Sequence, residues 1–412
     1  MTADHWNGPD ASQERIDVMK GWLALLLAAM LTACSASGGA ASGGAAASAP
    51  SSAGSSAAQE APSQSQEEAP PEETPAVDNT WQVDLPENHN MDPAVFEALH
   101  AALPGSGIHS VVTVKDGVII DEYYEDGCDA DSLFQLHSAS KSYTGALIGI
   151  AIEEGYIDSV DDPLSKYLPQ VLEQEDTRKQ QLTLRHLLTH TSGLEWYEWG
   201  SGYSNWNEFR SADNWVDYIL GRSLVYEPGT VFNYSTGNTH LLSAVLEAAT
   251  GMGQEEYCRI HLFDPMGVSE ETYWGTDPQG IVDGGNGLVT TARDAAKFGQ
   301  LFLNGGVWNG EQLVPAAWVE ESTAAKNNGA GDGTGSYGYQ WWMRSFTTGG
   351  YGTYSTPYPA ATYDVYYAFG HAGQFILVVP ELELVTVFTS SCQSSYGPRP
   401  YFTDYILNAY MG

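Results

Sequence analysis

Ser138 and Lys141 stand three positions apart at the start of an apolar stretch, 145–152, and a hydroxyl and an amine at this spacing can act as nucleophile and base. If the stretch is a buried helix, residues at i and i+3 share one helix face, so the Lys141 amine can reach the Ser138 hydroxyl. Burial would also lower the pKa of the lysine, because desolvation disfavours its charged form. The alternative is an exposed polar pair in which Ser138 only caps the helix.

Strands near both ends of the globular part, with helices between them, are expected to position this pair. The turn signal Lys115-Asp-Gly117 lies between two apolar runs and predicts a hairpin. The expected strands are 108–114, 118–124, 374–379 and 384–389, the last two joined through Pro380, and the expected helices are 91–103, 182–188, 241–249, 292–303 and 402–411. This order predicts an α/β (α+β) fold, with one antiparallel sheet flanked by helices and a mostly helical subdomain at about 155–285.

The N-terminal part carries a targeting signal. Residues 22–33 are almost wholly apolar, follow Lys20 and end in Leu-Thr-Ala before Cys34, which is typical of a bacterial lipoprotein signal peptide. We therefore predict a signal peptide over 19–34, a misassigned extension over 1–18, and lipidation of Cys34 that anchors an extracytoplasmic protein to the membrane. The alternative is an uncleaved anchor or a chance apolar run, although the stretch is too short to span a bilayer.

Composition separates a linker from a domain and excludes one class of partner. Residues 35–79 consist almost entirely of Ser, Ala, Gly, Pro, Gln and Glu, which predicts a disordered tether, and a single globular domain is expected over 80–412. The 412 residues contain 16 Lys+Arg against 52 Asp+Glu, a formal net charge of -36. Nucleic acid is therefore an unexpected partner, since binding it requires a cationic surface. The oligomeric state is left open.

The cysteines and histidines do not form a metal motif. Apart from Cys34 the chain has Cys128, Cys258 and Cys392, so at most one internal disulfide is possible, and its pairing is open. His186 and His190 are four residues apart on an expected helix but lack the acidic residue of an H-E-x-x-H motif. We interpret them as packing residues and expect no metal site.

Longer motifs resemble a known family. The segment Leu182-Thr-Leu-Arg-His-Leu-Leu-Thr-His-Thr-Ser-Gly-Leu194 is similar to a signature of the beta-lactamase-related serine hydrolases, the superfamily of class C beta-lactamases and DD-peptidases. Ser138-Ala-Ser-Lys141 matches the S-x-x-K motif of penicillin-interactive serine enzymes. Further resemblances follow in the expected order at 227–235, 263–267, 285–294 and 370–373.

The resemblance implies acyl-enzyme chemistry at a groove between the sheet and a helical region, without metal or organic cofactor. It implies that Tyr234 relays protons between Ser138 and the leaving group. The backbone N–H groups of Ser138 and Gln374 would form the oxyanion hole. His371-Ala-Gly373 would take the place of the family's Lys-Thr-Gly, on an edge strand against which substrate lies.

Two departures from the family pattern concern the substrate. Tyr-x-Asn is replaced by Tyr234-Ser-Thr236, and Lys-Thr-Gly by His371-Ala-Gly, which removes a carboxamide and a permanent cation. Both changes weaken the case for efficient lactam hydrolysis. Asn233 or Asn238 could supply the missing carboxamide, or each could be a turn residue. The aromatic stretches 196–206 and 351–367 either cover the groove or only pack onto the domain.

The leading hypothesis is an extracytoplasmic serine hydrolase that cleaves a small ester or amide. Thr239-His-Leu-Leu-Ser243 also resembles the aminohexanoate-oligomer hydrolase branch of the family. One alternative is a D-alanyl-D-alanine carboxypeptidase or weak beta-lactamase that acts at the cell wall. A second, from another class, is an inactive penicillin-binding fold used as a surface lipoprotein. The sequence leaves open whether Lys141 or Tyr234 is the principal base.

Overall fold

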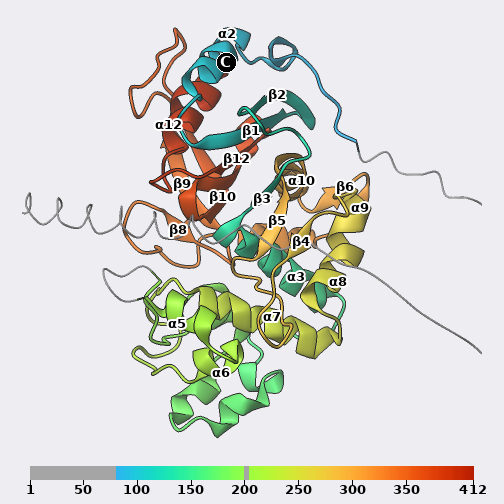
Figure 1. Ribbon diagram of the computed structural model, residues 1–412, viewed down its shortest axis with the longest axis vertical. Coiled ribbons are helices and arrows are strands. Elements are labelled where there is room, and N and C mark those ends of the chain that lie inside the picture. The colour runs from blue at the N-terminus through green and yellow to red at the C-terminus, as the bar shows by residue number, and fades with distance from the viewer. Residues whose placement is uncertain (1–79, 199–203) are drawn as a thin grey trace, which may run out of the picture. The chain divides into compact units, whose positions relative to one another are not determined.

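The computed structural model describes residues 80–198 and 204–412 of the chain (Figure 1). The expected signal peptide, the lipidated Cys34 and the linker over 35–79 lie outside these residues. None of the helices in the described part combines the length and apolar character that a membrane span requires.

The main sheet has seven strands in the order β2-β1-β12-β11-β10-β9-β8, and every neighbouring pair is antiparallel. A smaller sheet has the order β3-β5-β4, and β6 pairs with β7. The strands are β1 (Ile108–Lys115), β2 (Val118–Tyr124), β3 (Leu133–Gln135), β4 (Tyr273–Trp274), β5 (Leu288–Thr291), β6 (Val307–Trp308), β7 (Glu311–Gln312), β8 (Ser336–Tyr337), β9 (Trp342–Thr347), β10 (Thr362–Gly370), β11 (Gln374–Val379) and β12 (Leu384–Ser390).

Helices cover both faces of the main sheet. The α-helices are α2 (Pro93–Ala102), α3 (Ser140–Glu153), α4 (Leu184–Leu188), α5 (Asn205–Ser211), α6 (Trp215–Leu220), α7 (Thr236–Thr250), α8 (Gln254–Cys258), α9 (Asp264–Met266), α10 (Ala292–Leu303), α11 (Ala316–Ser322) and α12 (Arg399–Tyr401). Figure 1 shows α2 and α12 together on one side of the sheet, while α10 packs against β1, β11 and β12 on the other.

The two-residue period of a strand explains the two cores. On β11, Phe375 and Leu377 join the core beneath α2 and the C-terminal helical segment, whereas Ile376 and Val378 join the core that contains α3 and α10. All residues of β11 are buried, because helices cover both of its faces. The strand therefore reads as an unbroken apolar run rather than as an alternating one.

These findings confirm the predicted fold class of an antiparallel sheet flanked by helices. The hairpin turns at Asp116 and Gly117, both with positive φ, and α10 has the predicted bounds. Two local expectations were wrong. The helix that holds His186 ends at Leu188, so His190, with a φ of 54°, lies outside it. The C-terminal segment is a series of short α, π and 3-10 turns rather than one helix over 402–411.

Helix α3, which begins two residues after Ser138, is buried along nearly its whole length. Gly149 on this helix lies against the Trp318 ring of α11, where a Cβ atom would come within 2.3 Å of the ring. Only glycine allows the two helices to approach this closely.

Replacing Gly149 with alanine is expected to destabilise the fold. The added methyl group overpacks the α3–α11 contact, which costs about 1–3 kcal/mol and exceeds the gain in helix propensity of about 1 kcal/mol. Urea denaturation of Gly149→Ala should show a lower free energy of unfolding than that of the parent. Gly275→Ala is the control, since this residue lies outside the helices and a Cβ there meets no atom closer than 4.0 Å. Equal stability of the parent and Gly149→Ala would contradict the packing argument.

Candidate active site

Ser138 lies on a single 3-10 turn, His137–Ala139, between β3 and α3. Strand β3 is tied to the small sheet, and the Leu136 N–H just after it donates to the Leu288 carbonyl over 2.8 Å. His137 then takes the left-handed region with a φ of 49°, a strained conformation for a residue other than glycine. This sharp turn places Ser138 in the lining of a pocket. Lys141 follows in the first turn of α3.

The Lys141 amine contacts three oxygen atoms in the interior. Its Nζ is 3.0 Å from Ser138 Oγ, 2.9 Å from Thr236 Oγ1 and 2.6 Å from the Gly285 carbonyl oxygen. The side chain is 1% exposed, and burial lowers the pKa of Lys141 to about 8, against the opposing effect of the Glu198 and Asp283 carboxylates. The predicted contact between the Lys141 amine and the Ser138 hydroxyl is therefore present in the structure.

Tyr234 joins the same cluster from the segment just before α7. The centroid of its ring lies 5.0 Å from Lys141 Nζ, and the Ser138 side chain is close enough to affect the pKa of its phenol. The ring packs against His190 and stacks on Trp342, with centroid distances of 4.7 and 5.7 Å. Burial raises the pKa of Tyr234 far above its ordinary value, so the phenol keeps its proton at neutral pH.

Thr236 occupies the place of the family's asparagine and contacts the lysine rather than the pocket. Besides accepting from Lys141, its hydroxyl donates to the buried carboxylate of Glu198, and its backbone N–H donates to the same carboxylate over 2.9 Å. Sequence reasoning missed Glu198, which lies four residues beyond the matched segment 182–194. No local pattern marks it, because its partners are distant in the chain.

A loop at 283–287 contacts both Lys141 and the turn that carries Ser138. Gly285 provides its carbonyl to Lys141, and the Asn286 side chain lies 3.3 Å from His137 Nδ1. A Cβ on Gly284 would fall 2.1 Å from Ser243 Oγ, so this close approach requires glycine. The resemblance at 285–294 pointed to this loop without indicating what it does.

His371 and Gly373 form a tight turn between β10 and β11, not part of an edge strand. The edge-strand expectation was wrong, because β11 pairs on both sides with β10 and β12. The His371 ring packs edge to face against the ring of His137, the residue before Ser138, with a centroid distance of 5.6 Å. Gly373 has a φ of 97° and no room for a Cβ beside Ser390. The Gln374 side chain bonds Ser390 away from the pocket, and the oxyanion role of its N–H stays a prediction.

The pocket in front of Ser138 has a volume of about 400 Å³. Its walls are mainly aromatic and small polar residues, and they include no lysine or arginine among the described residues. The lining residues are Ser138, Tyr234, Ala330, Asp332, Thr334, Trp342, Phe369, Gly370, His371, Ser394, Ser395 and Tyr396.

Neither asparagine considered as a replacement carboxamide lines this pocket. The Asn233 amide donates to the carbonyls of Leu194 and Trp196, and Asn238 accepts from the Ser192 hydroxyl. Both side chains therefore form hydrogen bonds within the domain near the start of α7.

Several described aromatic residues of the stretches 196–206 and 351–367 pack onto the domain. Trp196 is buried beside Phe209. Tyr354 stacks on Tyr405, and the Tyr358 hydroxyl donates to Asp92. The described residues of these two stretches leave the pocket lining to other segments.

His186 and His190 hydrogen-bond within the domain, and the three cysteines of the described part are free. Cys128, Cys258 and Cys392 form no disulfide with one another, and Cys258 is buried. His186 Nδ1 accepts from the Thr183 N–H at the start of α4, and buried His190 lies 3.1 Å from the Tyr337 hydroxyl.

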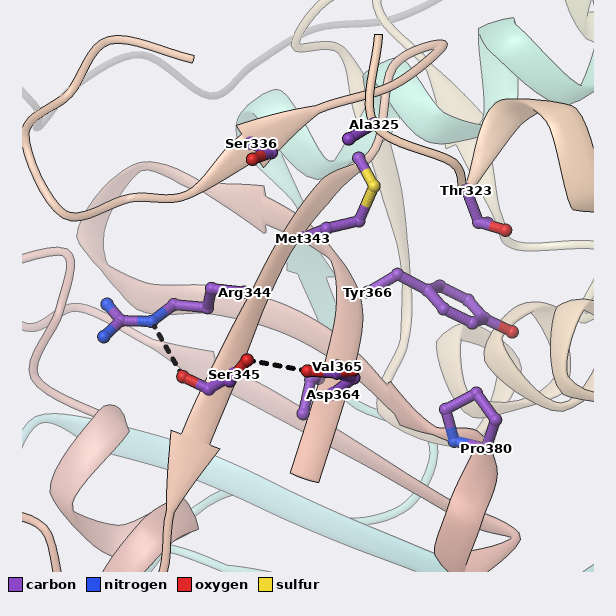
Figure 2. A pocket seen from close by; sticks show the side chains of 10 residues that line it. All are labelled: Thr323, Ala325, Ser336, Met343, Arg344, Ser345, Asp364, Val365, Tyr366 and Pro380. Carbon is purple, nitrogen blue, oxygen red and sulfur yellow. Dashed lines mark hydrogen bonds between the residues drawn. The ribbon is translucent and has the colours of Figure 1, made fainter. Parts of the chain in front are cut away.

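A second hollow, of about 360 Å³, lies at the β8–β9–β10 edge of the main sheet (Figure 2). Two of its polar side chains have partners within the lining: the Ser345 hydroxyl donates to the Asp364 carboxylate over 2.6 Å, and Arg344 Nε donates to the Ser345 backbone carbonyl. No lysine lies beside Ser345 in this lining, so the hollow holds no counterpart of the Ser138–Lys141 pair.

Parts of this chain are similar in sequence to known proteins. A 6-aminohexanoate-dimer hydrolase of Paenarthrobacter ureafaciens is 27% identical over 250 residues, which are 56% of this chain and 63% of that protein. Penicillin-binding protein 4* of Bacillus subtilis is 35% identical over 144 residues, 34% of this chain and 30% of that protein. The matched regions thus span less than two thirds of either relative.

Solved structures share the fold. EstCE1, a hydrolase with promiscuous acyltransferase activity, superposes with a TM-score of 0.59 at 17% identity, covering 78% of this chain and 98% of that one. The octameric penicillin-binding protein homologue from Pyrococcus abyssi has a TM-score of 0.59 at 19% identity, with 77% of each chain covered. The beta-lactamase family model matches residues 94–411, and the chain therefore belongs to the beta-lactamase family, the serine hydrolases of the beta-lactamase fold.

Proposed function

We propose that this protein hydrolyses a small ester or amide through an acyl-enzyme on Ser138. The observation that carries the proposal is the 3.0 Å contact between Ser138 Oγ and a buried Lys141 amine whose pKa is lowered to about 8. A lysine of ordinary pKa would be charged at neutral pH and could not accept a proton. Here a usable fraction of the amine is neutral, and it lies against the hydroxyl it has to activate.

The reaction follows from these positions. Ser138 Oγ attacks the substrate carbonyl carbon while its proton passes to Lys141 Nζ. The tetrahedral intermediate collapses to the acyl-enzyme, and the bond to the leaving alcohol or amine breaks as that group takes a proton from the Tyr234 phenol. Lys141 returns a proton to Tyr234, since its Nζ lies near that ring. Water then attacks the acyl-enzyme and releases the acid.

The two pKa shifts favour Lys141 over Tyr234 as the principal base. The lowered pKa of Lys141 makes its neutral form available, whereas the raised pKa of Tyr234 keeps that phenol protonated. A group that retains its proton can donate it but cannot start the reaction by accepting one. Tyr234 is therefore assigned the donor step at the leaving group.

The pocket supports a neutral, partly apolar substrate. Trp342, Phe369 and Tyr396 provide aromatic wall, and His371 is the sole basic side chain in the described lining. A substrate carboxylate would meet an imidazole rather than a permanent cation. The similarity to a 6-aminohexanoate-dimer hydrolase agrees with a short amide as one substrate class. We also propose, on the sequence signal alone, that lipidated Cys34 anchors the enzyme outside the cell membrane.

Ser138→Ala is expected to lower the hydrolysis of nitrophenyl esters by at least about a thousandfold, because no other group supplies the nucleophile. The test compares parent and variant on aryl esters, linear amides, a D-Ala-D-Ala peptide and a chromogenic lactam. Aryl esters or linear amides should be cleaved fastest by the parent. Fastest cleavage of the peptide or lactam would favour the cell-wall alternative. A folded parent that neither turns over these substrates nor reacts with a fluorophosphonate would favour the surface-binding lipoprotein.

The rate should rise with pH through the pKa of Lys141. Since the neutral amine is the base and its pKa is about 8, kcat/KM should fall about tenfold for each pH unit well below that value. No loss is expected up to about pH 10, because Tyr234 stays protonated beyond the ordinary tyrosine pKa. The measurement is kcat/KM for a nitrophenyl ester from pH 6 to 10, corrected for spontaneous hydrolysis. A flat profile between pH 6 and 9 would exclude Lys141 as the base.

A further inference from the structure

Glu198 is a buried carboxylate with no direct contact to the nucleophile. It is 6% exposed and lies just after Trp196. Its Oε2 accepts from the Trp196 indole N–H and from the Thr236 backbone N–H, and its Oε1 accepts from the Thr236 hydroxyl. Three donors on one carboxylate hold it firmly, and a buried charge requires such partners.

The direction of the Thr236 hydroxyl follows from these contacts. A hydroxyl has one proton to donate, and here that proton goes to Glu198. Thr236 Oγ1 can therefore only accept from Lys141 Nζ, which lies 2.9 Å away. The Gly285 carbonyl, 2.6 Å from the same nitrogen, is also an acceptor only.

These two acceptors decide which way the neutral amine faces. Charged Lys141 has three N–H groups for its three oxygen neighbours. When it loses a proton, two N–H groups remain, and Thr236 and Gly285 each require one of them. The lone pair must then point at the third neighbour, Ser138 Oγ, 3.0 Å away. This orientation is the one in which the amine can take the serine proton.

We propose that Glu198 is a positioning residue, which directs the Thr236 hydroxyl and thereby aims the lone pair of neutral Lys141 at Ser138. The proposal rests on the function proposed above and adds the group that prepares its base. Glu198 also brings a negative charge close to Lys141, which favours the ammonium form after the serine proton has been transferred.

Glu198→Gln reverses the hydroxyl while keeping the shape of the side chain. Two N–H donors converge on Oε2, so the amide oxygen must take that place and the NH₂ group must face Thr236 Oγ1. Thr236 then accepts from Gln and turns its own proton toward the lone pair of Lys141, in competition with Ser138. The variant also removes a charge that raises the pKa of Lys141.

The test measures the rate at which a fluorophosphonate labels Ser138 between pH 6 and 10. In this reaction the serine oxygen bonds to phosphorus, fluoride leaves, and the serine proton passes to Lys141, so the rate reports activation without a known substrate. Glu198→Gln should lower the plateau rate by about tenfold or more, within the range of general-base contributions. The acid limb of its pH–rate profile, the range in which the rate rises with pH, should also move to lower pH by about one unit, because the lost charge no longer raises the pKa of Lys141.

Glu195→Gln is the matched control, because this carboxylate in the same segment pairs with Arg222 rather than with the site. It should label like the parent. If Glu198→Gln only loosened the segment around residue 198, the plateau labelling rate would fall while the acid limb of the pH–rate profile stayed in place. This result would overturn the proposal. So would a folded Glu198→Gln protein with the parent's rate and profile.

Thr236→Val and Thr236→Ser provide a second route if Glu198→Gln does not fold. Valine removes the bridging hydroxyl and should lower the labelling rate by about tenfold or more, while serine keeps the hydroxyl and should restore most of it. Equal rates for valine and serine would overturn the proposal. A parent that is labelled yet cleaves no ester or amide would contradict only the proposed function, whereas a parent that is not labelled would contradict both.

Discussion

The structure depends on keeping one lysine amine out of water and surrounded by oxygen atoms. Charged groups are rarely buried without partners, because desolvation costs several kcal/mol. Lys141 is buried and has three close acceptors, with two carboxylates nearby that partly offset the loss of hydration. The balance leaves its pKa near 8 rather than at either extreme. An amine in this condition can exchange a proton with a serine near neutral pH.

Segments far apart in the chain must meet to create that environment. The turn before α3 carries Ser138, the start of α7 carries Thr236, and the loop at 283–287 carries the Gly285 carbonyl. Each meeting involves a close approach of backbone, and glycine makes it possible at positions such as Gly284 and Gly370, where a Cβ would clash with a neighbouring oxygen. These close approaches bring oxygen atoms from three separate segments to Lys141 Nζ.

The acid–base assignment proposed above follows from environments that move two pKa values in opposite directions. Burial lowers the pKa of Lys141 and raises that of Tyr234, because in both cases it disfavours the charged form. The amine becomes a better proton acceptor and the phenol keeps its proton. Burial thereby gives two neighbouring groups different proposed roles around Ser138.

The sequence alone was sufficient for the features that depend on neighbours in the chain. The Ser138–Lys141 contact follows from helical spacing, the β1–β2 hairpin from its turn residues, and α10 from its apolar period. The tertiary structure decided the rest. Glu198 meets Thr236 across 38 residues, and the turn at His371 lies beside His137 because β10 ends against Leu136. No local pattern encodes such contacts, since they arise only when separate elements pack together and exclude water from the groups between them.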